Sequence, residues 1–132
     1  MDKYGILSKT KLTTSWQTLY SCPEPQETTY DSSNISVTPK SVNKPTSTLV
    51  SSVVVCRLVA TGGTADWFSL AVVNAAGDAV ALADYICYQQ DVAGGTTKII
   101  SMGMTLKGGQ TLKGIGEAND SVTIIVNGVE IF

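Results

Sequence analysis

From residue 49 onward, short apolar segments alternate with turns that contain glycine. Three of these turns carry glycine pairs, at Gly62-Gly63, Gly94-Gly95 and Gly108-Gly109. The apolar segments are rich in Val, Ile and Leu, which favour pleated strands. Strands at intervals of about 8 to 12 residues with tight turns between them are typical of a sandwich or a barrel. The sequence therefore predicts a single antiparallel β-sandwich, all-β and jelly-roll-like, with about eight strands.

The predicted strands cover most of the chain outside one long insertion. We place them at residues 4–12, 16–22, 49–60, 66–73, 85–90, 98–104, 110–116 and 122–132. Residues 79–88, "AVALADYICY", have an apolar spacing that also tolerates a short helix, so this segment has two interpretations.

Residues 23–48 contain all four prolines of the chain, many Ser and Thr, and few large apolar residues. Proline stops a strand because it donates no ladder hydrogen bond. We therefore predict one domain, residues 1–132, with an extended loop or arm at 23–48 after the second strand. Structureless loops of this length are uncommon in compact domains, which favours a functional arm.

Composition excludes several classes of function. The formal net charge is −2 and only 15% of the residues are charged, so no basic field predicts nucleic-acid binding. The chain has no histidine, which removes Ser-His and Cys-His catalysis and the commonest metal ligand. We interpret the loose acidic group Asp78, Asp84 and Asp91 as solvated caps, and we expect no enzyme, no metal and no cofactor.

The cysteines, the first residues and the apolar runs indicate whether the chain is secreted or inserted in a membrane. Cys22, Cys56 and Cys87 are an odd number at wide spacing, which predicts free thiols rather than disulfides. The first residues, "MDKYGILSK", predict no signal peptide. The longest apolar run, at residues 49–60, is interrupted by Arg57, so no membrane span is expected.

The last segment, "VTIIVNGVEIF", is apolar to its final residue. Val122, Ile124 and Val126 share one parity, whereas Val129 and Ile131 have the other. A bulge at residues 127–128 would return the last two to the core, because one extra residue shifts the period-2 register.

Several strands are apolar on both parities, as in residues 53–58 and in the adjacent pairs Ile99-Ile100 and Ile124-Ile125. A two-layer sandwich usually leaves one face of each sheet polar. Two apolar faces therefore favour packing against other subunits, in a homo-oligomer. The candidate interface residues are Tyr30, Ile35 and Val37 in the arm and Ile125, Ile131 and Phe132 at the end, with ordinary core packing as the alternative.

The order of several segments resembles a known group of proteins. These segments are "YGIL", "TLYSCPE", "LVSSVVVCRLVA" with "ADWFSLAVV", "ALADYICYQQDV", "SMGMTLKGGQTLKG" and "VNGVEIF". Together they resemble small β-sandwich structural proteins in the virions of tailed bacteriophages, of the tail or neck accessory type or the decoration type. Two features depart from the group: Gln110 stands where an acidic residue is usual, and the 23–48 insertion is longer.

The resemblance implies a non-enzymatic accessory subunit of a phage tail, baseplate or neck. Its partners would be other virion proteins, and it would be assembled in the host cytoplasm into the virion. A capsid decoration protein that cements capsomers is one alternative. Another is a carbohydrate-binding module of a receptor-binding tip, because exposed aromatic rings stack on sugars. The candidate rings are Trp16, Tyr20, Tyr30, Trp67, Tyr85 and Tyr88.

Overall fold

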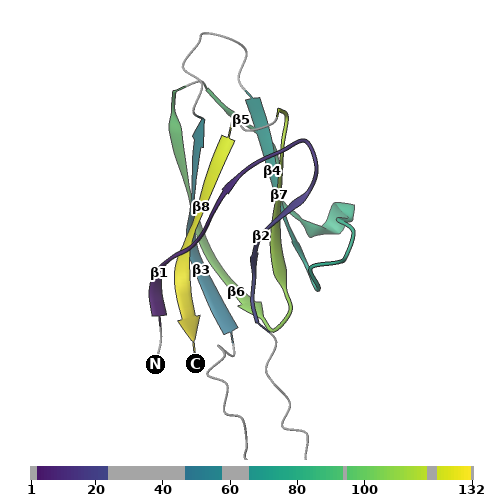
Figure 1. Ribbon diagram of the computed structural model, residues 1–132, viewed down its shortest axis with the longest axis vertical. Coiled ribbons are helices and arrows are strands. Elements are labelled where there is room, and N and C mark those ends of the chain that lie inside the picture. Colours follow the sequence, from purple (N-terminus) through teal and green to yellow (C-terminus); the bar gives the residue numbers. More distant parts are fainter. Residues whose placement is uncertain (1–2, 24–46, 58–65, 94, 119–121, 132) are drawn as a thin grey trace, which may run out of the picture.

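The computed structural model of the chain is a sandwich of two four-stranded antiparallel sheets (Figure 1). It describes residues 3–23, 47–57, 66–93, 95–118 and 122–131. The strands are β1 (Lys3–Lys11), β2 (Gln17–Ser21), β3 (Ser47–Arg57), β4 (Asp66–Val73), β5 (Tyr85–Val92), β6 (Thr97–Lys107), β7 (Thr111–Gly116) and β8 (Val122–Ile131). The prediction of an all-β sandwich of about eight strands is confirmed.

The strand order is β1-β8-β3-β6 in the first sheet, here sheet A, and β2-β7-β4-β5 in the second, here sheet B. The pairs β1 with β8, β2 with β7, β3 with β6 and β4 with β5 are therefore neighbours. The chain forms one nested set of antiparallel pairs that alternates between the sheets. This wrapping is the jelly-roll topology that the sequence predicted.

The helical interpretation of residues 79–88 is correct only for one short turn. A 3-10 helix, η1 (Leu82–Asp84), precedes β5. Residues 85–88 belong to β5, as the main prediction had it, and residues 79–81 form no regular element.

The core lies between the sheets and is filled by alternate residues of the central strands. In β3, Val53 and Val55 are fully buried, and in β4 Phe68 and Leu70 are fully buried. The core also contains Leu12, Leu19, Cys22, Val50, Val92, Leu106, Leu112, Val122, Ile124 and Val126. This apolar burial is the main stabilising contribution to the sandwich.

The predicted bulge at residues 127–128 of the last strand is wrong in its placement. β8 pairs continuously with both neighbours, and the register shifts lie on β1 between Ile6 and Ser8 and on β3 between Val50 and Ser52. Because the extra residues are on the neighbours, β8 keeps its strict alternation. Val129 and Ile131 therefore stay on the outer face of sheet A and do not return to the core.

Side chains and one glycine stabilise the shifted register. The Ser51 hydroxyl donates to the carbonyl oxygen of Asn127 at 3.2 Å, and the Asn127 amide donates to the Ser52 hydroxyl at 3.3 Å. At Gly128, a Cβ atom would overlap the carbonyl oxygen of Leu49. Glycine is required at this position because the backbones approach so closely.

A polar link joins the two sheets at the end where both termini lie (Figure 1). The Tyr20 hydroxyl donates to Oε2 of Glu130 at 3.0 Å and lies 2.9 Å from the Thr48 hydroxyl. Burial raises the pKa of Tyr20 to about 12. The hydrogen bond with Thr48 opposes this shift, and the Glu130 carboxylate reinforces it. Glu130 thus faces inward although its neighbours Val129 and Ile131 face outward.

The glycine requirement predicts that Gly128→Ala lowers the free energy of unfolding by about 1–3 kcal/mol, the usual cost of overpacking. Gly103→Ala is the matched control, because a Cβ atom at Gly103 meets nothing within 4 Å. Urea unfolding of both variants measures the difference. Equal stability of the two variants would contradict the close approach at Gly128.

The Tyr20 link predicts a loss of stability at high pH. The pKa of Tyr20 is raised in the folded chain, so its contribution is complete below about pH 10 and is lost as the pH rises toward about 12. Tyr20→Phe is expected to flatten the dependence of the unfolding free energy on pH in this window. Denaturant titrations at several pH values measure it, and an unchanged slope in the variant would exclude Tyr20 as the cause.

Candidate functional site

The outer face of sheet A carries aligned rows of apolar side chains. The register places Lys9, Ile125, Val54 and Ile99 in one row across β1, β8, β3 and β6. A second row contains Tyr4, Val129, Leu49 and Thr105. All of these residues have the parity opposite to the buried core residues, so their side chains point away from sheet B.

Exposure on this face increases toward its edges. Tyr4 is 81% exposed, Ile6 56%, Ile99 67% and Ile131 37%. The central residues Leu49, Val54, Ile125 and Val129 are half-buried, because neighbouring side chains of the same face cover their flanks. These eight apolar residues, all in the described part of the chain, thus share one sheet face.

The sequence predicted part of this face. Ile125 lies at its centre, opposite Val54, and Ile131 lies at its terminal end, opposite Ser47. The remaining candidate interface residues, Tyr30, Ile35, Val37 and Phe132, lie outside the described residues. The sequence prediction missed Tyr4, Ile6, Leu49, Val54 and Val129 as members of the face, although the apolar residues on both parities of β3 were the signal for Val54.

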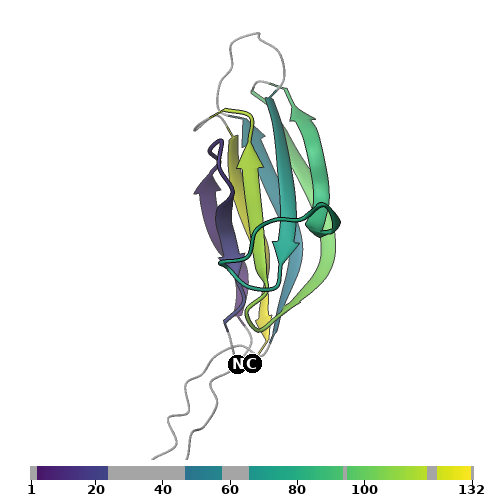
Figure 2. The same cartoon turned by 90° about the vertical axis from the view of Figure 1, so that its right-hand side faces the viewer.

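The outer face of sheet B is different, because side chains and a loop cover much of it. Figure 2 shows the segment between β4 and η1 crossing this face. Lys113 donates to the carbonyl oxygen of Asp78 in that segment at 2.9 Å. The pairing of β4 with β7 places Ala71 and Ser69 on the outer face. Even so, Ala71 is 0% exposed and Ser69 is 2% exposed.

Three aromatic residues also gather on sheet B. Tyr85 contacts Trp16 with ring centroids 5.6 Å apart and Tyr88 at 5.2 Å, both edge-to-face. Of the other aromatic candidates for sugar stacking, Tyr20 points between the sheets toward Glu130, and Tyr30 lies outside the described residues. Trp67 lies opposite Asp91 and has no ring contact with this cluster. Because these rings pack edge-to-face against one another, they do not form parallel platforms on which sugar rings could stack.

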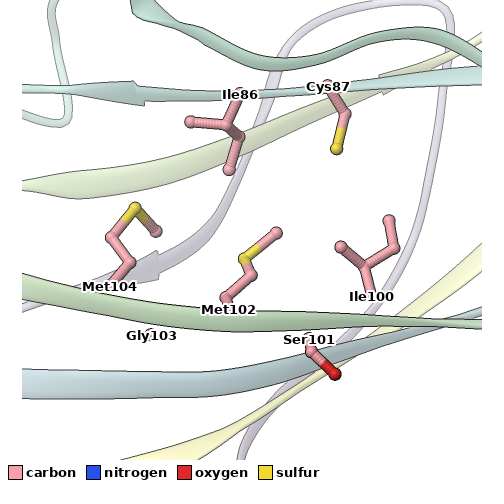
Figure 3. A pocket seen from close by; sticks show the side chains of 7 residues that line it. All are labelled: Ile86, Cys87, Ile100, Ser101, Met102, Gly103 and Met104. Atoms are coloured by element: carbon pink, nitrogen blue, oxygen red, sulfur yellow. The ribbon is translucent and has the colours of Figure 1, made fainter.

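An open apolar groove of about 480 Å³ lies where edge strands β5 and β6 face each other (Figure 3). Ile100, Met102 and Met104 of β6 point toward β5, which contributes Ile86 and Cys87, whereas Ser101 points away. Burial raises the pKa of the Cys87 thiol, and the positive charge of Lys98 opposes this shift. The groove is apolar and offers few polar groups that could orient a substrate.

Within the described residues, no group of three or more Cys, Asp or Glu side chains could hold a metal ion. In the same part of the chain, no helix is long and apolar enough to cross a membrane.

Comparisons with family models, with curated proteins and with solved structures found no match to this chain. The fold and the surfaces therefore carry the functional argument.

The orientation of β3 predicts different costs for the same substitution at two neighbouring positions. Val54→Thr on the outer face is expected to leave the free energy of unfolding nearly unchanged. Val55→Thr, at a fully buried position, is expected to lower it by about 1–3 kcal/mol, because a hydroxyl group is buried without a hydrogen-bond partner. Urea unfolding under monomeric conditions measures both values, and similar costs at the two positions would contradict the assignment of the faces.

Proposed function

We propose that the chain is a non-enzymatic structural subunit of a tailed-phage virion, an accessory protein of the tail, baseplate or neck. The observation that carries this proposal is the apolar outer face of sheet A. Large contiguous apolar patches are rare on monomeric proteins and mark interaction surfaces. A protein that assembles with copies of itself or with other virion proteins would bury this face.

Burial of the face supplies adhesion without any chemistry. Each Å² of apolar surface removed from water contributes about 25 cal/mol, and repeated contacts in a symmetric particle multiply a modest affinity. The sequence supports a non-enzymatic role, since the chain has no histidine. Asp84 supports it too, because its carboxylate accepts a hydrogen bond from the Ala81 amide at 2.8 Å, as a cap does.

The resemblance to phage virion proteins supports the same proposal. Three of the motifs that carry it fall on structural elements of the jelly roll: "TLYS" on β2, "SMGMTLKGGQTLKG" on β6, the turn and β7, and "VNGVEI" on β8. A capsid decoration protein would use the same sheet face, so it is the second candidate. The edge-to-face aromatic cluster on sheet B gives less support to a carbohydrate-binding module.

Immunogold labelling of purified phage particles tests the proposal. Antibodies raised against the chain are expected to label particles of the phage that encodes it at one fixed location, on the tail, baseplate or neck. Particles assembled without the gene product are the control. Label over the whole capsid surface would favour the decoration protein instead, and intact particles without label would contradict a virion role.

A further inference from the structure

The described charged side chains are divided between the two sheets. Lys9, Lys11 and Lys107 are exposed, and the register places all three on the outer face of sheet A. The described residues place no acidic side chain on this face, since Glu130 points inward to Tyr20. The apolar rows of sheet A are therefore bordered by positive charge.

The sheet B side of the molecule carries the opposite charge. Asp91 is exposed and has outward register on β5, and Asp84 belongs to η1, which projects beyond sheet B (Figure 1). Exposed apolar side chains accompany these carboxylates: Leu82 is 88% exposed and Tyr88 is 59% exposed. Two described cations lie on or beside this side: Lys113 already donates to a backbone carbonyl, and Lys98 of β6 lies near Cys87 of β5.

This division bears on how two copies can meet. Packing sheet A against sheet A would bring the lysines of both copies together with no described carboxylate between them. Like charges across an interface select against such a partner. Packing sheet A of one copy against the sheet B side of another joins lysines to carboxylates and apolar residues to apolar residues.

We propose that the outer face of sheet A binds the sheet B side of a second copy, along η1 and β5, which carry Leu82, Asp84, Tyr88 and Asp91. This inference rests on the proposed function and adds which surfaces of two copies are in contact. Such a contact is heterologous, because it joins two different surfaces. Each copy keeps one surface free for the next, so the contact repeats and generates a closed ring or a filament.

A charge-swap experiment tests this arrangement. One double variant, Lys9→Glu with Lys11→Glu, reverses the charge on sheet A. The other, Leu82→Lys with Asp91→Lys, reverses it on the sheet B side. All four residues are exposed, so both variants are expected to fold, and circular dichroism verifies this. Lys98→Glu is the control, because Lys98 is exposed but has the inward register of β6, opposite Val55, and its reversal leaves the lysines of sheet A and the carboxylates of the sheet B side in place.

The mass in solution is measured by light scattering after size exclusion at low salt, where exposed charges are least screened. The wild-type chain and the Lys98→Glu control are expected to form oligomers larger than dimers, and each double variant alone is expected to be monomeric. An equimolar mixture of the two double variants is expected to regain an oligomer that contains both in equal amounts, because each reversed surface meets its complement.

Two results would overturn the inference. One is a monomeric wild-type chain. The other is a variant changed at Leu82 and Asp91 that keeps the wild-type mass, which means that these residues do not form the contact with sheet A. Neither result affects the immunogold test. Labelled particles would support the virion role even if the chain is monomeric in solution, and unlabelled particles would contradict that role whatever the mass in solution.

Discussion

The uninterrupted alternation of β8 determines both the core and the outer surface of sheet A. This strand lies between β1 and β3, and its odd and even residues face opposite sides along its whole length. The extra residues of the sheet are on β1 and β3, and Gly128 allows the carbonyl of Leu49 to approach. As a result, Ile124 and Val126 fill the core while Ile125 and Val129 form the outer face.

Local sequence patterns predicted the strands because period-2 alternation and turn glycines act over a few residues. The position of the register shift could not be predicted in this way. The extra residue of a bulge can be on any of the three paired strands. Here the extra residues are Leu7 on β1 and Ser51 on β3, and neither residue type indicates a bulge. The candidate site was only partly predicted for the same reason: Ile125 and Ile131 belong to one segment, whereas Tyr4 and Ile99 reach the face only through long-range pairing.

The two sheets differ in how their outer faces are covered. On sheet B, the segment between β4 and η1 crosses the outer face (Figure 2), and outward residues such as Ala71 are fully buried. On sheet A, the described residues supply no comparable cover, and Ile99 and Tyr4 are largely exposed. A face with aligned apolar rows and a basic border has the composition of an interface core with a polar rim. We therefore regard sheet A as the assembly surface.

Cys56 provides a native probe of this surface, because it lies on the outer face of sheet A, opposite Thr123 of β8 and Thr97 of β6. The most direct measurement is alkylation of Cys56 in the isolated chain and in intact particles, read by peptide mass spectrometry. If sheet A is the assembly surface, Cys56 is alkylated in the isolated chain at a dilution at which it is monomeric, and it is protected in the particle. Equal alkylation in both states would contradict the account.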